Sequence, residues 1–97
     1  MKISILASAK NDLKDGFLLY EKQQVGLGRY FLSALRADID SLQFFSGIHP
    51  VYANKFYRLL SRRFPYAIYY QVTGDLVKVY AVLDCRRKPA KTLGRLS

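Results

Sequence analysis

The first quarter of the chain changes from an alternating pattern of apolar residues to a helical one. Ile3, Ile5 and Ala7 alternate with Lys2, Ser4 and Ser8, which predicts a short strand with one face toward a core. From position 9 to 24 the larger apolar residues recur three or four positions apart, so we expect a helix there. Ser8 stands where a side chain would cap the first turn of that helix.

A second apolar stripe begins directly after a glycine-rich break at 26–28. Gly26 can adopt the positive φ that ends a helix, because it has no side chain to clash with the backbone. The stripe predicts a second helix, and the short break would make the two helices an antiparallel hairpin. Its large apolar members are Leu27, Phe31, Leu35, Ile39 and Leu42.

After Pro50 the pattern becomes alternating, and strands are expected over 56–63, 66–73 and 76–83. Gly74 and Asp75 fit a two-residue type II′ turn between the last two strands. The strand over 66–73 has two faces, with Tyr66, Ile68, Tyr70 and Val72 on one and Ala67, Tyr69, Gln71 and Thr73 on the other. Alternation on the last strand puts its apolar residues on the core face, so the opposite face would be open or would meet a partner. These core residues are Val77, Val79, Ala81 and Leu83.

The predicted order of elements is therefore β-α-α-β-β-β. It corresponds to an α+β fold in which a helical hairpin packs on a small, mostly antiparallel sheet. With 97 residues, of which 51% are hydrophobic, the chain has the size and composition of one folded domain over 1–97. The segment 89–97 is expected to be a basic C-terminal tail.

Positive charge is concentrated in the second half of the chain. Sixteen Lys and Arg against seven Asp and Glu give a net charge of +9. Residues 1–48 include six basic and five acidic residues, whereas 49–97 include ten basic and two acidic ones. This imbalance predicts a polyanionic or strongly acidic partner.

The small number of cysteines and histidines and the lack of a long apolar run disfavour several other classes of protein. A single Cys and a single His exclude an intramolecular disulfide and supply too few ligands for an ordinary zinc site, so no metal and no cofactor is expected. No apolar run reaches the roughly 20 residues that span a bilayer. We therefore expect no membrane contact and a cytoplasmic location.

Four runs of residues follow one another along the chain: GLG at 26–28 with Phe31 after it, YRL at 57–59, RFPYAIYY at 63–70 and VLDCRRKP at 82–89. Together, and in this order, they resemble the RelE/ParE toxin superfamily, from the first strand to about Pro89. The resemblance implies the toxin of a type II toxin-antitoxin pair. Such a toxin inhibits growth, serves plasmid stabilisation, and is neutralised by an acidic antitoxin of the ParD or RelB type.

The resemblance leaves two mechanisms open. RelE-like members are ribosome-dependent ribonucleases that cut messenger RNA, whereas ParE-like members poison DNA gyrase and are not known to be enzymes. The positions of one nuclease arginine and one nuclease lysine are Ala67 and Leu60 here. Arg58 and Arg87 match, but no Tyr, His, Asp or Glu follows Arg87. Because arginine is a poor proton shuttle at neutral pH, these differences favour a ParE-like protein that acts by binding gyrase.

Six basic residues from two segments are the expected contacts for the antitoxin or the target: Arg58, Arg62, Arg63, Arg86, Arg87 and Lys88. An antiparallel sheet could bring the two segments close together, and the mutual repulsion of these side chains calls for an acidic partner. No residue is predicted to be catalytic on the ParE-like interpretation. On the alternative, a metal-independent ribonuclease acting on messenger RNA at the ribosome, the candidates are Lys55, Arg58, Arg62 and Arg87.

Four further residues have ordinary structural interpretations. Lys55 is expected to be a solvated lysine, His49 a local cap or hydrogen-bond partner, Cys85 a packed and inert thiol, and Asp84 the partner of Arg86 or Arg87. Most of the eight tyrosines are expected to pack across strands rather than to stack on bases. A non-toxic, basic nucleic-acid-binding domain is the third alternative, which accounts for the charge but not for the order of the motifs.

Overall fold

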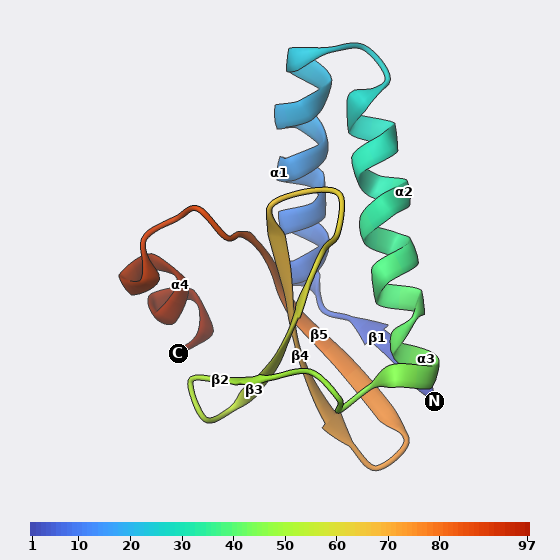
Figure 1. The fold of residues 1–97 in the computed structure, drawn as a ribbon, viewed down its shortest axis with the longest axis vertical. Coiled ribbons are helices and arrows are strands. Elements are labelled where there is room, and N and C mark those ends of the chain that lie inside the picture. The colour runs from blue at the N-terminus through green and yellow to red at the C-terminus, as the bar shows by residue number, and fades with distance from the viewer.

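A five-stranded sheet stands at the centre of the structure, a computed structural model that describes residues 1–97 (Figure 1). The strands are β1 (Lys2–Ile5), β2 (Val51–Tyr52), β3 (Phe56–Leu60), β4 (Tyr66–Thr73) and β5 (Leu76–Asp84). Their order is β1-β5-β4-β3-β2, with β1 parallel to β5 and every other pair antiparallel. The helices are α1 (Ala7–Gln23), α2 (Leu27–Asp40), α3 (Leu42–Phe45) and α4 (Pro89–Leu96). The predicted α+β fold is confirmed.

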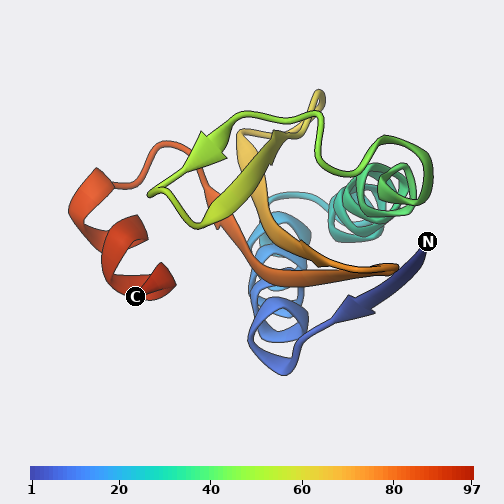
Figure 2. The same ribbon diagram turned by 90° about the horizontal axis from the view of Figure 1, so that it is seen from below.

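The helices α1 and α2 form the predicted hairpin, which packs on one face of the sheet (Figure 2). Gly26 has the predicted positive φ, at 91°, and lies directly before α2. The carboxylate of Glu21 accepts hydrogen bonds from the N–H groups of Gly26 and Gly28, each at 3.0 Å. The first N–H groups of a helix have no partner within it, so Glu21 stabilises the start of α2.

Close approach of the two helices depends on Gly16 of α1. A Cβ atom at Gly16 would lie 2.5 Å from Cζ of Phe31, so no other residue fits without displacing that ring. Phe31 is fully buried, and its ring centroid lies 5.1 Å from that of Phe64 and 4.9 Å from that of Tyr66. This aromatic cluster joins the hairpin to the start of β4.

The alternation predicted for β4 is confirmed. Tyr66, Ile68 and Tyr70 belong to the cluster of 15 buried residues between the hairpin and the sheet, and Val72 packs against that cluster. Ala67 and Tyr69 lie in a second cluster on the other side. We call the side of the sheet away from the hairpin the outer face.

β5 departs from strict alternation at Tyr80. Tyr69 pairs with Ala81, and Tyr70 pairs with Val79, so Tyr80 is left without a partner as a β-bulge. The hairpin face holds Val77, Val79 and Val82, and the outer face holds Ala81 and Leu83. The prediction that Val77, Val79, Ala81 and Leu83 share one face is wrong. One inserted residue moves every later side chain to the opposite face.

The outer face, expected to be open or to meet a partner, is covered in part by α4. Leu96 is buried among Phe56, Ala67, Tyr69, Ala81 and Leu83. Beside it, the guanidinium group of Arg95 donates to both carboxylate oxygens of Asp12 in α1, each at 2.7 Å. Asp12 also accepts a hydrogen bond from the N–H of Val82 at 3.0 Å. The segment expected to be a tail is therefore a helix tied to both α1 and β5.

Smaller differences concern the ends of elements. The Ser8 hydroxyl donates to the carbonyl of Tyr80 at 2.8 Å, so the prediction that it caps α1 is wrong. β3 ends at Leu60 rather than at 63, and neither α3 nor β2 was predicted. Of the two turn residues between β4 and β5, only Gly74 has a positive φ, as a type II′ turn requires. No helix has both the length and the apolar character needed to span a membrane.

Candidate functional site

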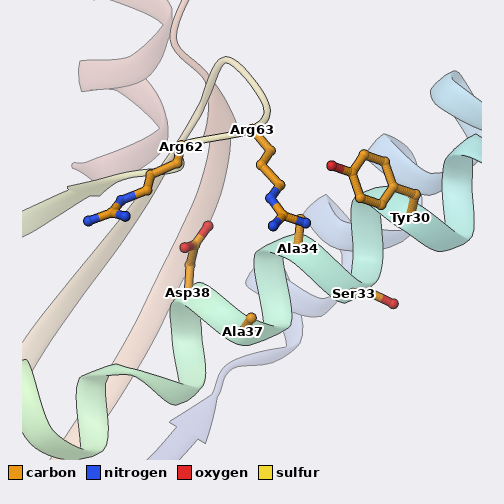
Figure 3. A pocket seen from close by; sticks show the side chains of 7 residues that line it. All are labelled: Tyr30, Ser33, Ala34, Ala37, Asp38, Arg62 and Arg63. Carbon is orange, nitrogen blue, oxygen red and sulfur yellow. The ribbon is translucent and has the colours of Figure 1, made fainter.

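Two of the predicted contact residues, Arg62 and Arg63, lie in the loop between β3 and β4 and face α2. They line a hollow of about 320 Å³ whose opposite wall includes Tyr30 and Asp38 (Figure 3). The guanidinium carbon of Arg63 lies 5.7 Å from the centre of the Tyr30 ring, a cation–π contact. Asp38 points toward the loop (Figure 3), yet neither arginine forms an ion pair. Both positive charges therefore remain available to a partner.

A second hollow, of about 440 Å³, adjoins the first, since Asp38 and Arg62 line both. Its apolar lining comes from Phe45 in α3, from Ile48 in the following connection, and from the end of β3. We call the two hollows together the α2 groove. Its charged end is formed by Tyr30, Asp38, Arg62 and Arg63, and its apolar end by Phe45, Ile48 and Leu60.

Arg58 lies on the outer face. β3 pairs it with Tyr69 of β4, and its guanidinium carbon is 5.1 Å from the centre of the Tyr52 ring. Burial raises the pKa of Tyr69, and the nearby guanidinium group of Arg58 partly offsets this effect. Arg58 is thus held against two aromatic side chains, and part of its surface serves packing.

Arg86 forms the local ion pair predicted for Asp84. The guanidinium group donates to both carboxylate oxygens, at 3.0 and 2.6 Å, and the backbone N–H of Arg86 donates to the same carboxylate at 2.8 Å. The hydrogen bond from the Arg86 side chain lowers the pKa of Asp84, and the same pairing raises the pKa of Arg86. Asp84 is therefore held ionised and does not act as a general acid near neutral pH.

Arg87 and Lys88 lie apart from the α2 groove. Arg87 lines a hollow of about 310 Å³ together with Asp12, Asp15 and Asp84. Lys88 is exposed directly before α4. The six predicted contact residues are therefore divided: Arg62 and Arg63 share the α2 groove, Arg58 packs on the outer face, and Arg86 and Arg87 lie beside carboxylates. Their part in binding stays a prediction.

The candidates of the ribonuclease alternative do not converge on one hollow. Lys55 is exposed in the turn before β3, with Nζ 5.8 Å from the centre of the Phe56 ring, and lines a hollow beside α4. Arg62 lines the α2 groove and Arg87 lines the hollow against α1. Ala67, at the position of a nuclease arginine, is fully buried in the cluster that includes Leu96 of α4. Apolar packing occupies the place where that arginine would stand.

His49 and Cys85 have structural surroundings. Nδ1 of His49 shares a hydrogen bond with the hydroxyl of Tyr70, which also accepts one from the N–H of Gly47 at 3.0 Å. Burial lowers the pKa of His49. Cys85 is exposed, so the prediction of a packed thiol is wrong, although partial desolvation raises its pKa. The raised pKa keeps the thiol protonated at neutral pH, which disfavours a reactive cysteine.

Sequence reasoning missed the α2 side of the groove. Tyr30 and Asp38 are eight positions apart, a spacing that puts both on one face of a helix, outside the apolar stripe. That signal is visible in the sequence. Only the folded chain shows that the loop with Arg62 and Arg63 lies opposite this face.

Comparison with solved structures identifies the fold. A chain of the structure titled "Chromosomal ParDE TA system from P. aeruginosa" matches with a TM-score of 0.78 and 15% sequence identity. The match covers 84% of this chain and 92% of that chain. The fold is ParE-like. This agrees with the motif resemblance, although no protein-family model and no curated protein matches the sequence.

Proposed function

We propose that this chain is the toxin of a type II toxin-antitoxin pair, a growth inhibitor neutralised by an acidic antitoxin of the ParD type. The observation that carries the proposal is the ParE-like fold, shared with a chain from a ParDE TA system. The net charge of +9 and the unpaired arginines of the α2 groove support an acidic partner. The proposed place of action is the cytoplasm.

Within this function we propose that the toxin acts by binding, with DNA gyrase as its target, and not by cutting RNA. Metal-independent cleavage of RNA needs a base, an acid and cations gathered around one phosphate. Lys55, Arg62 and Arg87 line three different hollows, and Ala67 is buried under α4. This dispersal supports a binding protein.

One observation favours the alternative, a ribosome-dependent ribonuclease acting on messenger RNA. Arg58 lies against Tyr52 and pairs with Tyr69 across the two strands, and a tyrosine hydroxyl can exchange a proton with RNA. Tyr69, however, is 3% exposed and its pKa is raised by burial. The third candidate, a nucleic-acid-binding domain without toxicity, has less support, since four of the tyrosines are buried and offer no stacking surface. These are Tyr20, Tyr66, Tyr69 and Tyr70.

The test is induced expression in a bacterial host that lacks an antitoxin, with growth, messenger RNA integrity and the DNA-damage response recorded together. We expect growth arrest, intact message and an induced damage response. A Phe31→Ala variant, which removes the centre of the core, is the control for toxicity caused by overexpression alone.

Each other outcome assigns a different function. Arrest with message cut at ribosome-bound positions would replace gyrase binding by ribonuclease activity. Normal growth of the folded wild-type protein would contradict the toxin proposal itself. Equally strong arrest by a Phe31→Ala chain that circular dichroism shows to be unfolded would also contradict it, because an unfolded chain cannot present the native surface.

A further inference from the structure

Exposed apolar side chains gather at one end of the α2 groove. Phe45 is 54% exposed, Ile48 72% and Leu60 53%, although side chains of this kind are usually buried. They come from α3, from the connection after it and from the end of β3, so the fold brings together three separate segments. A clustered apolar surface on a small protein marks a site that another molecule covers.

The other end of the groove carries unpaired charge. Arg62 and Arg63 extend from the loop on one side, and Asp38 extends from α2 on the other (Figure 3). A guanidinium group binds a carboxylate through two parallel hydrogen bonds. Arg63 already lies against the Tyr30 ring, so it loses little freedom when it binds.

The edge of the sheet beside the groove is also free. β2 pairs with β3 only at Phe56 and Tyr57, and one further hydrogen bond joins Arg58 N–H to the carbonyl of Pro50 at 2.9 Å. β3 continues to Leu60, where its outer edge has no neighbouring strand. An extended segment seated in the groove could therefore hydrogen-bond to this edge.

These features fit a peptide better than a nucleic acid or a second copy of the chain. Every nucleotide of a single strand carries a phosphate, so a nucleic acid would also bring negative charge to Asp38 and to the apolar end, whereas a peptide can place carboxylates at Arg62 and Arg63 and apolar side chains elsewhere. A second copy of the chain would bring another net charge of +9 to a site that already has unpaired arginines.

We infer that the α2 groove is the docking site for an acidic, amphipathic segment of a partner protein. The carboxylates of that segment bind Arg62 and Arg63, and its apolar side chains cover Phe45, Ile48 and Leu60. The inference rests on the proposed function, in which the partner is the antitoxin.

The experiment selects random 16-residue peptides on the purified chain by phage display and then measures the affinity of the enriched peptides by fluorescence anisotropy. Two double variants each change one end of the groove. Arg62→Glu with Arg63→Glu reverses the positive charge, and Ile48→Ser with Leu60→Ser replaces exposed apolar side chains by polar ones. The matched control is Lys22→Glu with Lys91→Glu, which changes the net charge by the same amount at exposed lysines outside the groove. Circular dichroism and thermal unfolding verify that each variant is folded.

We expect enriched peptides to combine Asp or Glu with Leu, Ile or Phe. The Arg62/Arg63 variant should bind them at least about tenfold more weakly, mainly through a slower and less salt-dependent association. The Ile48/Leu60 variant should also bind at least about tenfold more weakly, and the control should stay within about twofold. Amide NMR signals of 30–38 and 59–63 should shift when peptide is added to the wild-type chain.

Four results would overturn the inference: no enriched peptide, enriched peptides without acidic residues, equal binding to all variants, or shifts confined to other residues. If a 15-nucleotide single-stranded RNA binds and Arg62→Glu with Arg63→Glu abolishes this, the groove is a nucleic-acid site. A dimer that Ile48→Ser with Leu60→Ser dissociates would assign the groove to a second copy of the chain. Growth arrest by a chain that binds no peptide would overturn this inference alone, whereas peptide binding without growth arrest would contradict only the proposed function.

Discussion

The two faces of the sheet are both apolar, but helices of different number and length cover them. On the hairpin face, two helices of 17 and 14 residues cover a cluster of 15 buried residues. On the outer face, the eight-residue α4 covers a cluster of six. A helix of eight residues is unstable alone in water, so α4 depends on Leu96 and on the Arg95–Asp12 ion pair for its position. The hairpin face is therefore expected to contribute most of the free energy of unfolding, and α4 on the outer face is expected to open more readily than the hairpin.

The largest expected effect is at the centre of the hairpin face. Phe31→Ala removes a fully buried ring that contacts Tyr20, Phe64 and Tyr66, and should lower the free energy of unfolding by about 3–5 kcal/mol. Urea unfolding monitored by circular dichroism measures this change. Phe44→Ala, at a residue that is 79% exposed, should change it by less than about 0.5 kcal/mol. Similar effects of the two substitutions would contradict the central role of this cluster.

The corresponding substitution on the outer face should lower the free energy of unfolding by a smaller amount. Leu96→Ala removes the apolar side chain through which α4 packs on the sheet, and should lower the unfolding free energy by about 2 kcal/mol. Hydrogen exchange should show loss of protection in α4 while α1 and α2 stay protected. Leu93→Ala, at a residue that is 46% exposed, is the control and should have little effect. If Leu96→Ala destabilised the protein as much as Phe31→Ala, the two faces would not differ as described.

The ion pair between α4 and α1 should contribute less to the free energy of unfolding than the side chain of Leu96 does. Its side chains are 31% exposed at Arg95 and 9% at Asp12, so solvent weakens their attraction only in part. Arg95→Met should lower the unfolding free energy by about 1 kcal/mol. Asp12→Asn should lower the unfolding free energy by more than Arg95→Met does, because Asp12 also accepts the hydrogen bond from Val82 N–H. A double-mutant cycle measures the coupling, and independent effects of the two substitutions would show that the pair does not hold α4.

The smallest effect expected is a pH dependence at the edge of the hairpin face. Burial lowers the pKa of His49 from its ordinary value of 6.5, so the unfolded chain binds this proton more tightly than the folded chain. The stability that neutral His49 contributes is complete above pH 6.5 and is lost as the pH falls through the lowered pKa. The difference in unfolding free energy between wild type and His49→Gln should therefore narrow from pH 7.5 to pH 5. A difference that stays constant would show that His49 does not titrate in this way.

Prediction from sequence succeeded where structure depends on residues close together in the chain. The hairpin, the two faces of β4 and the Gly74-Asp75 turn follow from spacing and turn chemistry, and the Asp84–Arg86 pair follows from proximity. It failed at Tyr80, because a rule of strict alternation has no means of detecting one inserted residue. It also missed α4, because Pro89 at the first helical position and Arg95 in the last turn indicate where a helix would begin and end, but eight residues form a stable helix only with their packing partners.

The candidate site shows the same division. The sequence by itself determined the order of the main helices and strands, the apolar stripes and the excess of positive charge, because these depend on composition and on local periodicity. Only the tertiary structure decided that Arg62 and Arg63 face Tyr30 and Asp38 across a groove, while Ala67 lies buried under α4. The physical reason is that these contacts join residues far apart in the chain. These contacts form only when the helices and strands pack together, so the sequence of any one segment does not reveal them.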